Sequence, residues 1–302
     1  MQIQRMDLGD VGSPEGLIKQ ILKLEPNLPI PVPIEEFAYQ LDIDSIRELT
    51  TDGYEGGLIT DELRSSGTIL VSKSAMKGRR RFTIGHELGH FLIPMHKPVQ
   101  AGKFLCSRED MRQWSAKDTN AYARMEAEAN RFSALILMPP PKLRSFMGGL
   151  RDPDLGHIIN LATHFDVSKD PAARAYAEYN DNAVAIAVVK DGRVLRIYKN
   201  LKFPRVCVSF GDPVPAKSLY HYKPGLKSNP SSIQENGAEL WIESEWGKKL
   251  PTLYEQVFLQ QEGFALVMLW AEIADEDDET DEDENRTSKE RLRHRQASRS
   301  RY

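Results

Sequence analysis

The stretch TIGHELGHFL, residues 83–92, places two histidines, His86 and His90, four positions apart, with Glu87 directly after the first. In a helix, two imidazoles one turn apart can bind one tetrahedral metal ion. Glu87 cannot easily reach the same ion, but it can take a proton from a water molecule held there, which is the general-base role in metal-assisted hydrolysis. The spacing therefore predicts a metal-binding catalytic helix, although the bare HExxH pattern also occurs by chance.

The residues around this motif favour a helix with one buried face. We expect it to run from near Gly78 to Ile93, because Pro94 disfavours helical geometry in the residue before it. Gly85 and Gly89 each weaken a helix by about 1 kcal/mol relative to alanine, so we expect another backbone to approach closely there. The polar stripe should face a cleft while an apolar stripe buries the helix. The apolar stripe consists of Ile84, Leu88, Phe91 and Leu92.

A third ligand is expected in MEAEANRFSALILMPP, residues 125–140, because catalytic zinc sites use three protein ligands. Glu126 and Glu128 both fall in a predicted helix over residues 120–138, about 200° apart around its axis, so one ion cannot easily take both. Glu126 shares a polar face with Asn130 and is the preferred ligand. Glu128 is expected to face solvent and is the second choice. Asn130, one turn further on, is placed to hydrogen-bond a ligand histidine.

Composition and charge argue against several classes of protein. The chain has 302 residues, 28% of them charged, and a formal net charge of -4, which favours neither bulk nucleic-acid binding nor a membrane surface. No apolar run approaches the roughly 18 residues of a membrane span, and the first residues lack the layout of a secretory signal. The two cysteines, Cys106 and Cys207, lie far apart and cannot make a disulfide framework. These features indicate a cytoplasmic protein.

The order of helical and strand patterns predicts an α+β fold in four parts. Residues 1–24 are an N-terminal extension. Residues 25–179 form a mostly helical domain with a small sheet, to which the runs GGLIT and GTILVS contribute two strands. Residues 180–273 form a mostly β subdomain. The last part, residues 274–302, is acidic and then basic, and we expect it to be disordered.

Short runs of apolar residues locate the strands of the β subdomain. Two runs joined by Asp191 and Gly192 predict a hairpin, because this dipeptide suits the tight turn between antiparallel strands. Residues 97–120 are mixed and polar, and we expect a long loop with some local structure there, either a lid or substrate-contacting segment beside the site or a plain surface excursion. Further strands are expected at residues 206–210, 238–244 and 264–273.

The paired motifs RRRFTIGHELGHFL and EAEANRFSALILMPP closely resemble the ImmA/IrrE family of metallopeptidases, the DUF955 domain. The resemblance covers about residues 25–180. It implies a zincin-like fold, with the metal on His86, His90 and Glu126 and with Glu87 as the catalytic base. It also implies a substrate class, because family members are bacterial and phage regulators that relieve repression by cutting helix-turn-helix repressors.

Residues and resemblance together predict a metal-dependent intracellular endopeptidase of narrow specificity that cleaves a helix-turn-helix transcriptional repressor. Zn2+ suits two histidines and a glutamate best, and the same ligand types also accommodate Mn2+ or Fe2+. Two alternatives stay open: a metal-containing regulator that does not cut, and a toxin-antitoxin-like binding partner. We expect no helix-turn-helix domain before the motifs, and the folded part is not expected to bind nucleic acid directly or to enter a membrane.

Several other residues have a functional and a plain interpretation. Cys106 is either a removable fourth ligand or, as we favour, a structural thiol. His157 and His164 can polarise a substrate carbonyl if they approach the cleft, but such histidines more often lie on a helix surface or are partly buried. The arginines at 79–81 either clamp an acidic substrate segment or form a solvated helix start. His96 lies beyond the metal-binding helix and is not expected to be a ligand.

Overall fold

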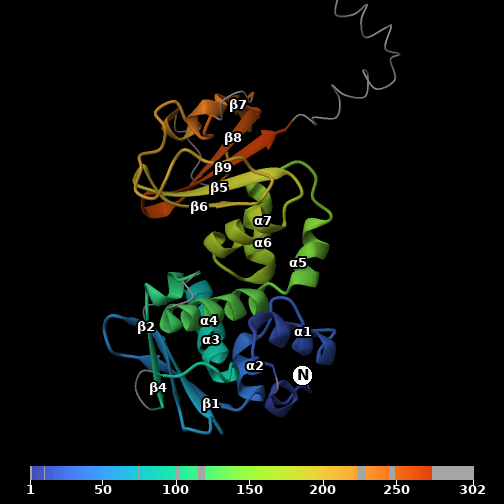
Figure 1. Cartoon of the computed structure of the whole chain (residues 1–302), viewed down its shortest axis with the longest axis vertical. Helices are drawn as coiled ribbons and strands as arrows, with labels where there is room; N and C mark the ends of the chain where they lie inside the picture. The colour runs from blue at the N-terminus through green and yellow to red at the C-terminus, as the bar shows by residue number, and fades with distance from the viewer. Residues whose placement is uncertain are drawn as a thin grey trace, which may run out of the picture. The chain divides into compact units, whose positions relative to one another are not determined.

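The computed structural model describes residues 2–9, 11–73, 75–98, 102–114, 120–222, 229–244 and 249–273. The chain divides into two compact units (Figure 1). The first unit comprises Met1–Asp152 and Gly156–Tyr179, and the second comprises Pro153–Leu155 and Asn180–Tyr302. The predicted disordered tail, residues 274–302, lies outside the described residues.

The described residues form seven α-helices and two β-sheets, which confirms the predicted mixture of helix and sheet. The two helices that carry the sequence motifs, α3 and α4, match the predicted helices to within one residue at each end. The helices are α1 (Pro14–Leu24), α2 (Ile34–Gln40), α3 (Lys77–Leu92), α4 (Ala121–Leu137), α5 (Pro140–Met147), α6 (Leu155–Phe165) and α7 (Lys169–Tyr179).

Local sequence explains where these helices begin and end. The side-chain oxygen of Asn120 accepts a hydrogen bond from the backbone N–H of Ala123 at 3.0 Å, which caps the N-terminus of α4. The prolines after Met138 end α4, and α5 starts directly among them because proline is tolerated in the first turn of a helix. Sequence patterns alone did not predict α5.

A four-stranded sheet in the order β1-β3-β2-β4 lies in the first unit. Its two central strands contain the predicted runs GTILVS and GGLIT, and they pair antiparallel with Leu58 opposite Ile69. The first strand pairs parallel with β3, whereas β4 pairs antiparallel with β2 and forms an edge. The bounds are β1 (Ile43–Leu49), β2 (Tyr54–Thr60), β3 (Gly67–Ser72) and β4 (Lys103–Ser107).

The strand β4 specifies the local structure expected within the loop over residues 97–120. The described part of that segment contains β4 and a short 3-10 helix, η2 (Asp110–Arg112). The five residues of β4 are too few to show a clear pattern in sequence, and β2 supplies the hydrogen-bonding edge that orders them. The strand alternates, with Phe104 and Cys106 buried on one face. Its buried face therefore points into the unit.

Helices α3 and α4 pack closely together at two glycines of α3. A Cβ atom on Gly85 would lie 2.6 Å from Oγ of Ser133, and one on Gly89 would lie 3.2 Å from Cα of Ala129. The expected close approach at these two glycines is confirmed. Strand β2 comes equally close from the other side, since a Cβ on Gly56 would lie 2.6 Å from Oε1 of Glu87. Glycine is thus required at each of these three close contacts beside the motif.

The apolar stripe of α3 is buried as expected. Ile84 and Leu88 are fully inaccessible, and Phe91 is 2% exposed. They belong to a core shared by the first three helices, α4 and the sheet. Residues of the N-terminal segment also enter this core, among them Ile3 and Leu8. Burial of such side chains contributes roughly 1.5–3 kcal/mol each, so the motif helix is fixed mainly by its apolar face.

The second unit contains a five-stranded sheet in the order β6-β5-β9-β8-β7, in which every pairing is antiparallel. The predicted hairpin joins β5 to β6, and its turn residues Asp191 and Gly192 have φ of 49° and 77°, as a tight two-residue turn requires. A separate apolar core covers one face. The bounds are β5 (Ala183–Lys190), β6 (Arg193–Lys199), β7 (Gln234–Asn236), β8 (Thr252–Leu259) and β9 (Phe264–Glu272).

Two predicted strands of this unit are wrong. Residues 206–210 and 238–244 form only an isolated bridge, between Val206 and Ile242. A short 3-10 helix, η4 (Ala238–Leu240), interrupts the second run and turns Trp241 fully into the core. The apolar residues there reach the core from a turn and not from a pleated strand. β-propensity does not distinguish these two cases.

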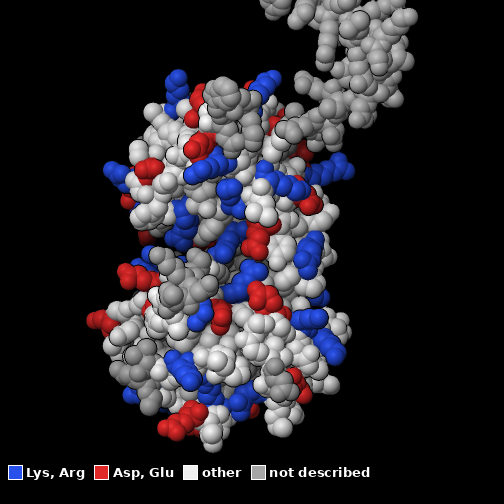
Figure 2. Space-filling model, in the orientation of Figure 1, with Lys and Arg blue, Asp and Glu red and all other residues white. Residues whose placement is uncertain are grey.

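The visible face of each unit has a mixed charge. Lys and Arg side chains lie among Asp and Glu in Figure 2, and neither kind forms a continuous field there. In the first unit, for example, Arg131 of α4 pairs with Glu15 at 2.9 Å and with Glu178 at 3.4 Å. Among the described residues, no helix is both long enough and apolar enough to cross a lipid bilayer.

The close contact between α3 and α4 predicts an unusual response to a glycine replacement. Replacing a helical glycine with alanine normally raises the free energy of unfolding by about 1 kcal/mol. We expect Gly85→Ala instead to lower it by about 1–3 kcal/mol, because the new Cβ would overpack the contact with α4. Urea unfolding measures the change, and adding Ser133→Ala should recover part of it. Gly149→Ala is the control, because its new Cβ would have only an ordinary contact. A stabilised Gly85→Ala protein would contradict the close packing.

Candidate metal centre

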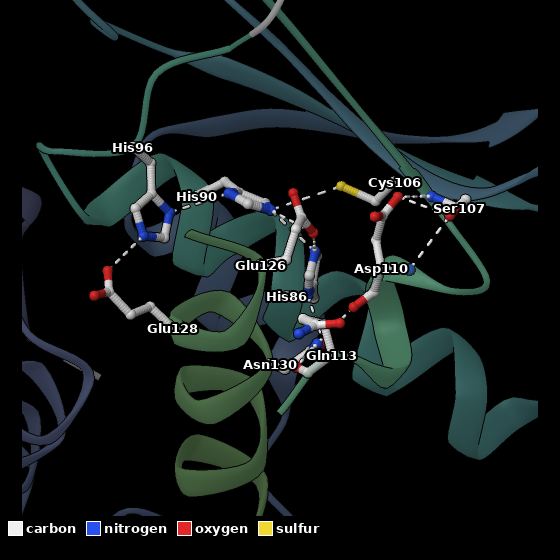
Figure 3. A network of polar contacts seen from close by, with 10 residues as sticks. All are labelled: His86, His90, His96, Cys106, Ser107, Asp110, Gln113, Glu126, Glu128 and Asn130. Carbon is white, nitrogen blue, oxygen red and sulfur yellow. Dashed lines mark hydrogen bonds and ion pairs between the residues drawn. The ribbon is translucent and has the colours of Figure 1, made fainter. Parts of the chain in front are cut away.

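Three elements of the first unit bring four polar side chains together (Figure 3). His86 and His90 come from α3, Glu126 from α4 and Cys106 from β4. One ligand atom from each lies within 4.8 Å of all the others. The three residues predicted as metal ligands are thus assembled, together with a cysteine for which a structural role was favoured.

The separations within this cluster are those of atoms that converge on one point. Nε2 of His86 lies 3.0 Å from Nε2 of His90. Oε2 of Glu126 lies 3.2 Å from the first of these nitrogens and 3.6 Å from the second. This oxygen has no hydrogen-bond partner of good geometry among the described residues. A buried oxygen without a partner needs an explanation, and a cation held by nitrogen and carboxylate ligands provides one.

Asn130 fixes the orientation of the His86 ring. The amide nitrogen of Asn130 donates to the carbonyl oxygens of Asp110 and Gln113, both at 2.7 Å. Its Oδ1 atom therefore faces Nδ1 of His86 at 2.9 Å, and the ring must donate this hydrogen bond. Nε2 of His86 is then directed at the cluster, as a metal ligand requires. Burial acts downward on the pKa of His86, but contacts with Glu126 and Glu87 raise it, so in the metal-free chain this nitrogen favours a proton that a metal ion would displace. The contact that was expected from α4 is present.

A second chain of contacts orients His90 in the same way. Nδ1 of His90 lies 3.0 Å from Nδ1 of His96, and Nε2 of His96 lies 3.0 Å from a carboxylate oxygen of Glu128. The carboxylate accepts from His96 Nε2–H, so His96 Nδ1 accepts from His90. Burial lowers the pKa of His90 and of His96 to about 3, and both rings are neutral near pH 7. The lone pair of His90 Nε2 therefore also points into the cluster.

His96 is the functional residue that sequence patterns missed. It follows the proline after α3, yet only 1% of it is exposed. Arg64 holds the turn, because its guanidinium donates to the carbonyl oxygens of His90 at 2.9 Å and of Ile93 at 2.8 Å, and also to that of His96. No spacing rule links an arginine of one loop to the end of a distant helix. Glu128 contacts His96 while 45% of its side chain is exposed to solvent, and it is not part of the ligand cluster.

Glu87 is buried beside the cluster. It is fully inaccessible, and neither carboxylate oxygen has a hydrogen bond of good geometry among the described residues. Burial raises the pKa of Glu87 to about 8, although the nearby His86 ring and the Cys106 thiol partly favour the charged form. For Glu126, burial acts upward, but contacts with both histidines hold its pKa well below the usual range. The two carboxylates thus differ strongly in basicity.

The remaining candidates from the sequence lie outside the cluster. Nδ1 of His157 lies 3.2 Å from the hydroxyl oxygen of Tyr176, and His164 packs against Phe146 and Phe165. The three arginines at 79–81 have structural partners. Those partners are Glu55 for Arg79, Glu35 for Arg80, and the carbonyl oxygens of Asp166 and Val32 for Arg81.

A histidine pair one turn apart, a glutamate beside it and a carboxylate from a second helix define the class of the metallopeptidases. The profile of the IrrE N-terminal-like domain, Peptidase_M78, matches residues 38–175, and the chain contains an ImmA/IrrE-family metallopeptidase domain. A solved structure described as a Mycobacterium tuberculosis transcriptional regulator has a similar fold, with a TM-score of 0.50 and 13% identity. The similarity covers 89% of this chain and 93% of that one. No curated protein sequence matches the chain.

The buried state of Glu87 predicts a pH-dependent stability of the metal-free protein. The pKa of Glu87 rises from 4.5 to about 8 on folding, so between these values the folded chain keeps a proton that the unfolded chain has released. Its contribution to stability is therefore complete below pH 4.5 and is lost as pH rises toward 8. Glu87→Gln has no such proton, and we expect it to gain stability relative to wild type across this window. Urea unfolding of chelator-treated proteins tests this, and a difference that does not change with pH would contradict it.

Proposed function

We propose that this protein is a zinc-dependent endopeptidase of narrow specificity, with a zincin-like active site, that acts in the cytoplasm on a helix-turn-helix transcriptional repressor. The observation that carries the proposal is the convergence of His86, His90 and Glu126 beside Glu87, a buried carboxylate that lacks a hydrogen bond of good geometry. The membership of residues 38–175 in a peptidase family supports the reaction class.

The residues that would hold the ion are His86, His90 and Glu126. Two imidazole nitrogens and one carboxylate are the ligand set of catalytic zinc sites in peptidases, and both rings direct Nε2 inward. Mn2+ and Fe2+ accept the same ligand types, so metal analysis is part of the test. A zinc ion bound there would supply a Lewis acid for the scissile carbonyl.

Glu87 performs the proton transfers in this proposal. Its elevated pKa, about 8 in the metal-free protein, reflects an environment that strengthens the carboxylate as a base. It takes a proton from the attacking water and later passes it to the leaving amine. Water attack joins OH to the peptide carbonyl carbon, the C–N bond breaks, and the proton held by Glu87 completes the new amine. General-base groups of this kind contribute about 10²–10⁴-fold in rate.

The repressor substrate rests on weaker support than the chemistry. Similarity of the paired motifs to the ImmA/IrrE family implies such a substrate, and the structural neighbour with the similar fold is described as a transcriptional regulator. The alternative is a metal-containing regulator that does not cut its partner. The two functions differ in one respect, because only the peptidase needs Glu87.

The first prediction for this function separates chemistry from metal binding. Purified wild type should contain about one zinc ion per chain, and Glu87→Gln should retain it but cleave about 10²–10⁴-fold more slowly. His90→Ala and Glu126→Gln should lose the ion. The substrate is the helix-turn-helix repressor encoded nearest to the gene, and new N-termini are mapped by mass spectrometry. Glu36→Gln, an exposed carboxylate on α2, is the control.

Each outcome of this experiment distinguishes between the peptidase, the non-proteolytic regulator and a protein without a metal site. Cleavage by Glu87→Gln at the wild-type rate would refute the assigned role of that residue. If Glu87→Gln still relieves repression in cells while His86→Ala does not, the non-proteolytic regulator replaces the peptidase. Wild type that contains no metal after zinc supplementation would refute both functions.

The second prediction concerns the contact between His90 and His96. We expect His96→Ala to weaken zinc affinity about 10–100-fold, because partners that orient a ligand histidine have effects of this size. His96→Gln retains a hydrogen-bond acceptor and should recover part of the loss. Competition with a chelating dye measures the affinity. His164→Ala is the control, since His164 is exposed and lies outside the cluster. Equal affinity of His96→Ala and wild type would contradict the orienting role.

A further inference from the structure

We infer that Cys106 is a fourth protein ligand of the proposed metal ion, so that the resting site is closed and the enzyme is latent until the sulfur leaves. The inference rests on the proposed function, because it concerns the same ion. It goes beyond that function by adding a ligand and a mode of control. Catalytic zinc sites keep one position open, whereas sites with four protein ligands are structural and closed.

The position of the sulfur fits a tetrahedral ligand. Zn–S and Zn–N bonds of about 2.3 and 2.05 Å at a tetrahedral angle place sulfur and nitrogen about 3.6 Å apart. Sγ of Cys106 lies 3.6 Å from Nε2 of His90. Two nitrogen or oxygen ligands of the same ion would lie about 3.3 Å apart, and the three separations among His86, His90 and Glu126 are 3.0, 3.2 and 3.6 Å. These four separations fit one shared ion, and the complete set of four ligand atoms lies within 4.8 Å of one another.

A second observation points to a ligand at the same place. Oε2 of Glu126 is buried, lacks a hydrogen bond of good geometry among the described residues, and points into the space that the sulfur also faces (Figure 3). The sulfur itself belongs to a residue that is 1% exposed. Cys106 belongs to the apolar core of the unit, as a structural thiol does, but its sulfur also has polar neighbours. The sulfur lies among two imidazoles and a carboxylate that carry the ligand atoms of a metal site.

The strand β4 holds the cysteine in position. Cys106 pairs with Gly56 of β2, and Phe104, two residues earlier on the same face, stacks on the His90 ring with centroids 4.8 Å apart. At the last residue of the strand, the backbone N–H and the hydroxyl of Ser107 both donate to a carboxylate oxygen of Asp110 at 2.7 Å. The sulfur is thus carried by an edge strand that is fixed on both sides of it.

Binding of the sulfur is a simple exchange. The S–H bond of Cys106 is replaced by a sulfur–metal bond, the proton passes to the buffer, and no electron is transferred. Release of the sulfur reverses these changes and vacates one ligand position. Only then can a substrate carbonyl approach, and only then does Glu87 have a water molecule to deprotonate. Cys106 is therefore an inhibitory ligand, and replacing it should activate the peptidase.

Cobalt substitution tests the ligand directly. Co2+ bound to a thiolate shows a sulfur-to-metal charge-transfer band in the near ultraviolet, which nitrogen and oxygen ligands do not give. The chain has two cysteines, Cys106 and Cys207, and the second is exposed in the other unit. In full-length Cys207→Ser, Cys106 is the only thiol, so the metal-free protein titrated with Co2+ should show the band. Cys106→Ser and Cys106→Ala should bind one Co2+ per chain without it.

Affinity and activity provide two further measurements. Zinc affinity should fall at least tenfold in Cys106→Ala, about the lower limit for losing even an outer partner of a ligand. Cleavage of the repressor by zinc-loaded Cys106→Ala should be faster than by wild type, while Cys207→Ser should match wild type.

The outcomes separate this inference from the proposed function. Cobalt bound by Cys207→Ser without the charge-transfer band would refute the fourth ligand and leave the three-ligand site intact. No cobalt bound by any protein would refute the metal site itself. A charge-transfer band together with slower or equal cleavage by Cys106→Ala would refute latency.

Discussion

The contact between α3 and α4 is the constraint on which the site depends. Gly85 and Gly89 let the backbone of α4 approach within the distance that a single Cβ would block. The metal-ligand geometry follows, because histidines of one helix and Glu126 of the other meet only at this separation. The two glycines each lower the stability of the helix by about 1 kcal/mol relative to alanine, and burial of the apolar stripe of α3 offsets that loss.

Two chains of hydrogen bonds around the cluster orient the two histidine rings in the same way. Asn130 acts on His86 through an amide whose direction is set by two backbone carbonyls, and His96 acts on His90 from the opposite side. Each chain leaves a ring with its Nε2 atom turned inward. The groups facing the centre thus lack good hydrogen bonds, while those behind it are satisfied. Such a pattern is costly without a cation and stable with one.

Access to the centre is the second constraint on function. The cluster is buried, and β4 places a sulfur within ligand distance of it. A site that holds its ion with four protein groups gains affinity but loses the open position that hydrolysis needs. Tight metal retention and catalysis are therefore alternatives at this centre, and the edge strand decides between them. The second unit has its own sheet and core, and its role does not follow from the chemistry of the first.

The sequence by itself predicted the motif helices, three residues that meet in the cluster, the contact of Asn130 with His86 and the hairpin at Asp191. Each of these depends on spacing within one segment, where helical or strand geometry relates positions in the chain to positions in space. The catalytic role of Glu87 stays a prediction. Only the tertiary structure decided β4, the place of Cys106 and the contact of His96 with His90. These depend on which strand edge or loop lies beside the motif helix, and no local period encodes that. The strands predicted near Trp241 were wrong for the same reason, since apolar residues can enter a core from a turn as well as from a strand.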